Sequence, residues 1–163
     1  MIKIENVSYR YPDSETEAIS RINVRFPKEH VLAILGQSGS GKTTLLNLIG
    51  GLDTPNQGQI IVEEVDITAM NPKQLIDFRL HNIGFVFQSY NLIPVLTAYE
   101  NVAFIMELQR APKPAIERRT NDILREVGLG DRMNSRPNQL SGGEQQRVAV
   151  ARAMASKPKF IIA

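Results

Sequence analysis

Several residue types are scarce in this sequence of 163 amino acids, and their scarcity limits the possible functions. There are no cysteines, which excludes a disulfide framework, a thiolate metal site and a cysteine nucleophile. Lys and Arg exceed Asp and Glu by only 19 to 17, so the charge does not indicate nucleic-acid binding. The longest strictly aliphatic run, residues 31–35, is far shorter than the roughly 20 apolar residues of a membrane helix. With no signal-peptide pattern at residues 1–9, we expect a cytoplasmic protein.

Composition and hydrophobic patterning indicate one globular domain of the α/β class. Apolar residues make up 42% of the chain and charged residues 22%, which argues against disorder. Early apolar residues alternate with polar ones, as on antiparallel strands, whereas residues 31–35 are apolar throughout, as in a strand covered on both faces. Strands are predicted at residues 2–4, 22–26, 31–35, 59–62, 83–87 and 159–162, and helices at 42–49, 72–80, 97–109, 114–127 and 141–156. The two middle helices, with no strand between them, predict a helical insertion.

The strongest chemical signal is a glycine-rich loop between an apolar strand and a helix. It consists of Gly36, Gln37, Ser38, Gly39, Ser40, Gly41, Lys42 and Thr43. Such a loop folds around a phosphate chain with its N–H groups inward, while Lys42 supplies positive charge and Thr43 a hydroxyl for Mg²⁺. A flexible Gly/Ser loop is the alternative interpretation. The strand immediately before it and the helix immediately after it favour a phosphate site.

A second motif opens the last predicted helix, at Ser141, Gly142, Gly143 and Glu144. Ser141 and Glu144 have the spacing of a capping box, which accounts for both residues without a ligand. It does not account for the two glycines, each of which can cost a helix up to about 1 kcal/mol relative to alanine. Their presence predicts that something approaches the backbone closely, and a phosphate is the natural candidate at a helix amino terminus.

Together the two motifs resemble the nucleotide-binding domain of ATP-binding cassette (ABC) transporters, which implies ATP and Mg²⁺ as cofactors. They occur in the right order, and their separation leaves no room for the long coiled-coil insertion of the related chromosome-maintenance and DNA-repair ATPases. Residues 84–88, 91–94, 96–98 and 100–102 are similar to a subfamily of lipoprotein-release, macrolide-export and antimicrobial-peptide transporters. The resemblance covers the whole chain.

The resemblance also implies roles for individual residues. Tyr11 looks like the aromatic residue on which adenine stacks; an ordinary strand-end tyrosine is the alternative. Gln88 looks like the glutamine that completes the Mg²⁺ shell with Thr43 and senses the γ-phosphate; the alternative is a solvated side chain at a strand end. Ser141 and Gly143 would contact the γ-phosphate of ATP held by a facing subunit. The nucleotide-binding set also includes Gly142, Glu144, all residues of the glycine-rich loop, and Thr44.

The fold implied by this resemblance is α/β, with a P-loop NTPase core, a mostly parallel sheet, an antiparallel amino-terminal edge and an inserted helical subdomain. Residues 1–163 would form one domain, with the core and β subdomain at 1–89 and 139–163 and the helical subdomain at 90–138. The implied partners are ATP, separate membrane permease subunits and a second ATPase domain in a head-to-tail homodimer or heterodimer, with no nucleic acid. The implied location is the cytoplasmic face of the plasma membrane, where ATP hydrolysis would drive transport.

The sequence departs from the family pattern near its carboxyl end. Residues 160–163 resemble the strand before the Walker B acids, but neither acid is present, and neither His30 nor His81 corresponds to the family's switch histidine. Loss of a catalytic base typically removes about 10²- to 10⁴-fold of rate. We therefore expect a truncated cassette that binds nucleotide weakly and hydrolyses it barely, from a parent that is an ATPase. The alternatives are a non-hydrolysing ATP-binding module and a soluble ABC protein acting on ribosomes, although the latter normally carries two cassettes.

Residues 88–96 are expected to couple ATP to transport. The polar residues 89–91 show no regular periodicity, which predicts a segment free to move. Residues 92–96 are apolar and interrupted by Pro94, and they could present a docking surface for a permease helix. The alternative is that they only pack the helical insertion against the core.

Overall fold

The computed structural model describes residues 1–27 and 31–163, so His30 lies outside the described residues. The chain divides into two compact units, Met1–Ile76 and Asp77–Ala163, each of which is considered by itself. In the part of the chain that the structure describes, no helix combines the length and apolarity needed to cross a membrane.

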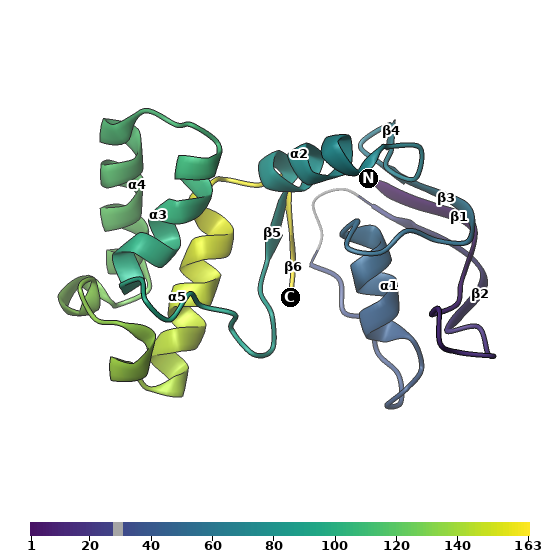
Figure 1. Cartoon of the computed structure of the whole chain (residues 1–163), viewed down its shortest axis with the longest axis horizontal. Helices are drawn as coiled ribbons and strands as arrows, with labels where there is room; N and C mark the ends of the chain where they lie inside the picture. Colours follow the sequence, from purple (N-terminus) through teal and green to yellow (C-terminus); the bar gives the residue numbers. More distant parts are fainter. Residues whose placement is uncertain (28–30) are drawn as a thin grey trace. The chain divides into compact units, whose positions relative to one another are not determined.

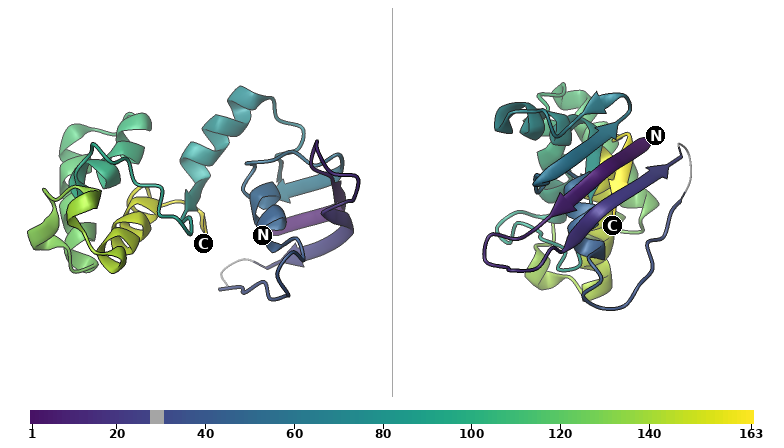
Figure 2. Two further views of the ribbon diagram at one scale, coloured as in Figure 1. Left: turned by 60° about the horizontal axis from the view of Figure 1, so that its bottom comes forward. Right: turned by 90° about the vertical axis from the view of Figure 1, so that its right-hand side faces the viewer.

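The first unit is built on a four-stranded antiparallel sheet with the order β2, β1, β3, β4 (Figure 2). The strands are β1 (Ile2–Tyr9), β2 (Ile19–Phe26), β3 (Gln57–Val62) and β4 (Val65–Asp66). Ile4 in the central strand β1 lies opposite Val24 of β2 and Ile60 of β3. Ile4 and Ile60 are buried, so the period-two alternation places one face of the sheet in the core, and the predicted antiparallel opening is confirmed.

A bulge in β1 keeps its apolar residues on the core face. Strict alternation after Ile4 would bury Asn6, but the pairing register shifts between Ile4 and Val7, and Val7 is the buried residue. Asn6 adopts a left-handed φ of 51°, and Gly58 of the facing strand has a φ of 87°. A side chain at Gly58 would overlap the Asn6 carbonyl, so this position requires glycine.

Helix α1 (Lys42–Ile49) coincides with the helix predicted for these residues. It buries Leu45, Leu48 and Ile49 within the first unit. Helix α2 (Pro72–Asn82) begins at the predicted proline and crosses the boundary between the two units.

The prediction of a strand at residues 31–35 is wrong. These residues form neither helix nor strand, and Val31 and Leu35 are exposed. A β-strand requires a neighbour to which its backbone can hydrogen-bond, and none of the described strands pairs with this segment. An apolar run gives the preference for a strand but does not supply the partner.

The second unit combines three helices with one parallel pair of strands (Figure 1). The helices are α3 (Ala98–Leu108), α4 (Lys113–Glu126) and α5 (Gly142–Ala155), the strands are β5 (Ile83–Phe85) and β6 (Phe160–Ile162), and two 3-10 turns are η1 (Gly130–Arg132) and η2 (Pro137–Gln139). The predicted helix starts at Thr97 and Ser141 are the N-cap residues of α3 and α5. The predicted helices therefore match the observed ones within one or two residues.

Helix α4 contributes an apolar stripe to the core of the second unit. Its buried residues are Ile116, Thr120, Ile123 and Leu124, whose spacing places them on one face of the helix. Ile116, Ile123 and Leu124 pack in one continuous cluster that includes Val102 of α3 and Val148 of α5. Thr120 is the one polar residue of this buried face. Its buried hydroxyl has no hydrogen-bond partner among the described residues.

We therefore expect Thr120→Val to stabilise the protein by about 1 kcal/mol, because an unsatisfied buried hydroxyl is replaced by a methyl group of similar volume. Thr120→Ser is the matched control; it keeps the hydroxyl, loses the methyl group and should destabilise the fold. Urea unfolding of the three proteins measures both changes. A less stable valine variant would show that the hydroxyl does have a stabilising partner.

Candidate nucleotide site

The glycine-rich loop reaches α1 through a left-handed residue. Gly41 is the N-cap of α1 with a φ of 86°, and Gly39 has a φ of 79°. A Cβ on Gly41 would lie 2.7 Å from the carbonyl oxygen of Ala18, so both its conformation and its surroundings require glycine. The glycines predicted to shape the loop therefore do so at Gly39 and Gly41.

Lys42 folds back over the loop that precedes it. Its Nζ donates to the carbonyl oxygens of Gly36 at 2.9 Å and Gln37 at 2.6 Å, and it lies 3.4 Å from the Ser40 hydroxyl. An ammonium group held by neutral oxygens keeps its charge available to an anion. The loop therefore places a positive charge beside its own backbone.

The amino terminus of α1 is open. Within the described residues no side chain caps it, and its first turn contains no acid. The first N–H groups of a helix have no partner within the helix, so an uncapped terminus favours an anion. Thr43 is exposed in this first turn, where its hydroxyl is accessible to a metal ion or a ligand.

Tyr11 lies against the same helix, in the first unit. Its hydroxyl is 2.8 Å from that of Thr44, which is buried, and its ring meets the Tyr9 ring edge-on at 4.9 Å. The Tyr11 side chain remains 40% exposed. The structure thus brings Tyr11, predicted as the adenine contact, next to the end of the glycine-rich loop.

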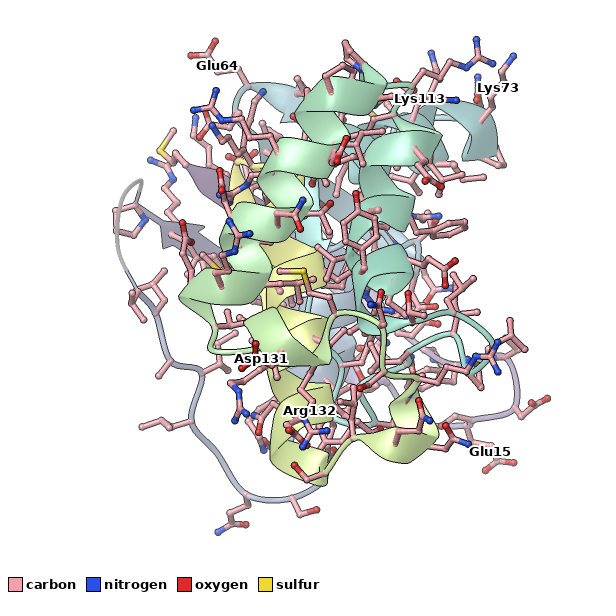
Figure 3. The ribbon with its side chains drawn as sticks, turned by 90° about the vertical axis from the view of Figure 1, so that its left-hand side faces the viewer. Glu15, Glu64, Lys73, Lys113, Asp131 and Arg132 are labelled. Atoms are coloured by element: carbon pink, nitrogen blue, oxygen red, sulfur yellow. The ribbon has the colours of Figure 1, made fainter. Side chains whose placement is uncertain are left out.

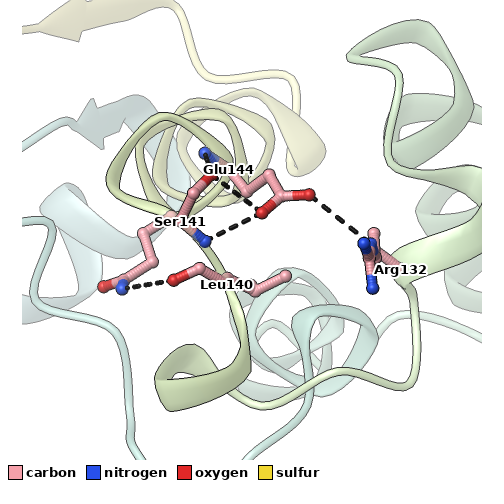
Figure 4. Close-up of polar contacts among 5 residues, drawn as sticks. Arg132, Leu140, Ser141 and Glu144 are labelled. Atoms are coloured by element: carbon pink, nitrogen blue, oxygen red, sulfur yellow. Dashed lines mark hydrogen bonds and ion pairs between the residues drawn. The ribbon is translucent and has the colours of Figure 1, made fainter.

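The amino terminus of α5 is closed by its own side chains (Figure 4). The Ser141 hydroxyl accepts from the Glu144 N–H at 3.3 Å and donates to Glu144 Oε2 at 2.8 Å, and the Ser141 N–H donates to the same oxygen at 2.8 Å. The capping box predicted from the sequence is therefore confirmed. The Ser141 hydroxyl can donate one hydrogen bond, and it donates this bond to Glu144.

The two glycines in this first turn have no role in the fold. Neither has a positive φ, and a Cβ on Gly142 or Gly143 would meet only the Tyr90 hydroxyl at 3.6 Å or the Arg147 guanidinium at 3.7 Å. Both are ordinary contact distances, so alanine would fit. Both glycines are exposed, and their smallness leaves the backbone of α5 open to close approach from outside.

Arg132 supports the capping box, a contact that no pattern in the sequence indicates. Arg132 belongs to the 3-10 turn η1 of the second unit (Figure 3), and its Nε lies 3.5 Å from Glu144 Oε1. Hydrogen bonds from Ser141, first of all its backbone N–H, lower the pKa of Glu144, and the positive charge of Arg132 adds to this. Glu144 therefore stays ionised at neutral pH.

Gln88 lies beyond the end of β5 and is exposed, whereas hydrogen bonds hold the backbone of the residues that follow it. Tyr90 and Asn91 have left-handed φ values of 60° and 47°, and their carbonyl oxygens accept hydrogen bonds from Arg152 of α5 at 2.8 and 2.6 Å. Residues 89–91 were predicted to be free to move, but Arg152 holds two of them. These hydrogen bonds join residues 61 and 62 positions apart, so no local pattern in the sequence indicates them.

Asn101 holds the next part of this segment. Its side chain is buried; Oδ1 accepts from the Ile93 N–H at 2.8 Å, and Nδ2 donates to the carbonyl of Leu96 at 3.1 Å. Leu92 packs against the helical core, as the packing alternative predicts, whereas Val95 is 73% exposed. The apolar segment therefore serves packing at Leu92 and leaves Val95 accessible.

The predicted site residues fall into two groups. Tyr11, the glycine-rich loop and Thr44 belong to Met1–Ile76, whereas Gln88 and Ser141 to Glu144 belong to Asp77–Ala163. The structure brings Tyr11 together with Thr44 in the first group, and Tyr90 together with Gly142 in the second.

Known proteins provide an independent comparison. A sequence model of the ABC transporter family matches residues 19–163. An uncharacterized ABC transporter ATP-binding protein of Thermotoga maritima is 46% identical over 155 residues, covering 95% of this chain and 66% of that protein. The ABC transporter ATP-binding protein YtrE of Bacillus subtilis is 38% identical, covering 100% of this chain and 73% of its own length. The chain thus spans about two thirds to three quarters of these relatives.

The fold agrees with this assignment. A solved structure described as the dimeric, post-hydrolysis state of the ATP-binding cassette MJ0796 bound to ADP and Pi has a TM-score of 0.91 and 39% identity, covering 99% of this chain and 72% of that one. The predicted α/β cassette fold is therefore confirmed. By sequence and by structure, this chain belongs to the ABC transporter family, as one of its ATP-binding proteins.

Proposed function

We propose that this protein binds ATP between its phosphate loop and the amino terminus of α1, and that hydrolysis of this ATP powers transport through separate membrane subunits. The observation that carries the proposal is the open terminus of α1, flanked by the Lys42 ammonium and a loop with two left-handed glycines. The β- and γ-phosphates would accept from the loop N–H groups, and Lys42 would exchange its carbonyl contacts for phosphate oxygens.

From the family resemblance we propose Thr43 and Gln88 as ligands of a Mg²⁺ ion that binds together with the ATP. Mg²⁺ prefers hard oxygen ligands and usually keeps several waters while binding phosphates and one or two protein groups. Thr43 offers a hydroxyl and Gln88 an amide oxygen, and both side chains are exposed. When bound, the ion would neutralise charge on the phosphates, while Gln88 would orient the water that attacks the γ-phosphate.

A second ATPase domain is proposed to complete the site through Ser141. The Ser141 hydroxyl has one proton, now donated to Glu144, so it would release Glu144 to donate to the γ-phosphate of a partner's ATP. Gly142 and Gly143 would allow that phosphate to approach the α5 backbone. The dimeric state of the solved relative supports this arrangement.

Several finer assignments are proposed together with this function. They are a helical subdomain at residues 90–138, adenine stacking on Tyr11, membership of the lipoprotein-release and macrolide-export subfamily, and a location at the cytoplasmic face of the plasma membrane. For residues 1–163 taken alone, which hold no carboxylate in the position of a Walker B base, we propose nucleotide binding with little hydrolysis.

Lys42→Ala should weaken ATP binding by about 10- to 100-fold, because a charge-assisted hydrogen bond is worth about 1.5–3 kcal/mol. Titration with a fluorescent ATP analogue measures the affinity. Lys73→Ala, which removes an exposed lysine of α2, is the matched control and should bind as the wild type does. Equal affinities for the three proteins, with equal melting temperatures, would contradict the assignment of the loop.

Ser141→Arg should abolish ATP-dependent dimerisation of the hydrolysis-blocked full-length subunit, because it places bulk and positive charge where the partner's phosphate approaches. The change also removes a helix N-cap, which typically costs about 1 kcal/mol. Thr97→Arg is therefore the control, since Thr97 caps α3 with the same kind of capping box. Sedimentation with ATP should show dimers of the Thr97 variant and monomers of the Ser141 variant. Dimers of both variants would exclude Ser141 from the interface.

Variants of Val95 and Leu92 distinguish the two possible roles of residues 92–96, which are docking to a permease and packing on the helical core. Val95→Ser should leave the melting temperature unchanged and lower stimulation of hydrolysis by the permease, because Val95 is exposed. Leu92→Ser should destabilise the isolated domain by about 2 kcal/mol, because Leu92 packs on the helical core. Melting curves, together with hydrolysis by the full-length subunit with and without permease, test both; normal stimulation in the Val95 variant would remove this residue from the docking surface.

A further inference from the structure

We propose that Arg152 is a positioning residue for Gln88, and that together with Tyr90 it joins the segment after Gln88 to both ends of α5. The inference rests on the proposed function only for the role of Gln88. The physical connection itself lies entirely within the second unit and stands on the hydrogen bonds of Arg152.

The connection begins with two adjacent carbonyl groups. Arg152 Nη2 donates to the carbonyl oxygen of Tyr90 at 2.8 Å, and Nη1 donates to that of Asn91 at 2.6 Å. A left-handed φ is unfavourable for Tyr90, whereas asparagine adopts it more readily, and the contacts of Arg152 help to fix both residues. The planar fork of a guanidinium binds two neighbouring oxygens at once, which a lysine ammonium does not do in a fixed geometry.

The cation is held at this place by neutral oxygens, with no negative partner among the described residues. In the salt bridges found among residues 1–27 and 31–163, no carboxylate pairs with Arg152. Arg152 is half-buried, and this burial lowers the pKa of its guanidinium. A partly desolvated charge needs its remaining hydrogen bonds, so the two carbonyls and the guanidinium fix one another.

Tyr90 extends the connection to the start of the same helix. Its hydroxyl lies 3.6 Å from the position that a Cβ on Gly142 would occupy, against the first turn of α5. Arg152, in the last turn of α5, holds the backbone of Tyr90. Tyr90 is thus hydrogen-bonded to the last turn of α5 and lies close to its first turn, and it is only two residues beyond Gln88.

The consequence is that Gln88 and the Ser141 motif are placed by the same helix. A phosphate that approaches Gly142 meets the Tyr90 side chain, and a shift of Tyr90 moves the backbone that carries Gln88. Without Arg152 the left-handed residues would relax, and Gln88 would lose its defined position while the phosphate loop of the first unit stayed intact.

Amide hydrogen exchange tests the physical connection. In Arg152→Met, amides of residues 89–93 should exchange about tenfold faster than in the wild type, with α5 amides unchanged. Arg152→Lys should lie between the two, because it keeps the charge and loses the fork. Arg118→Met is the matched control, since Arg118 is an exposed arginine of α4. If the methionine variant unfolds, the lysine variant decides; wild-type exchange of residues 89–93 in either folded Arg152 variant overturns the proposal.

Nucleotide titrations with and without Mg²⁺ test the link to Gln88. Arg152→Met should keep the Mg²⁺-free affinity for a fluorescent ATP analogue and lose the gain that Mg²⁺ gives, as Gln88→Ala does. The double variant should be no weaker than Gln88→Ala alone. Additive losses would show that Arg152 acts on stability only and would overturn its positioning role. A wild type with no Mg²⁺-dependent binding would instead contradict the proposed function, while the exchange experiment still decides whether Arg152 holds the segment.

Discussion

The rest of the site depends on what accepts hydrogen bonds from the first N–H groups of helices α1, α3 and α5. Helices α3 and α5 close their first turns with capping boxes built from Thr97 and Ser141. Helix α1 follows a left-handed glycine, has no side-chain cap from the described residues, and has Lys42 folded over the preceding loop. The unpaired N–H groups of α1 therefore favour an anion, whereas α5 must exchange its own carboxylate for one.

The second unit shows how irregular backbone is fixed by polar side chains, one buried and one half-buried. Residues 90–97 contain two left-handed residues and a proline, yet Arg152 and Asn101 satisfy the carbonyl groups of Tyr90, Asn91, Ile93 and Leu96. Unpaired carbonyl groups would be costly this close to the helical core. The segment proposed to report on ATP is therefore joined to the helical unit rather than free of it.

Local signals predicted most of this structure from the sequence. The capping box of Ser141 and Glu144 located the start of α5, and the helices predicted at residues 97–109 and 114–127 match α3 and α4 to within one residue. The segment at residues 31–35 was mispredicted because its apolar run shows preference and not pairing. The hold of Arg152 on Tyr90 was also missed, because the hydrogen bond joins residues 62 positions apart and leaves no local pattern. Local chemistry is thus readable from sequence, whereas contacts across the fold are not.

The central claim is that the open terminus of α1, and not the closed one of α5, receives the nucleotide phosphates in a single chain. NMR titration of the 163-residue chain with ATP tests it through the amide resonances of both termini. We predict downfield shifts for the amide protons of Gly39, Gly41 and Lys42 as they donate to phosphate, with those of Gly142 to Glu144 unchanged. Shifts confined to the start of α5, or the absence of shifts at both termini at saturating ATP, would contradict the account.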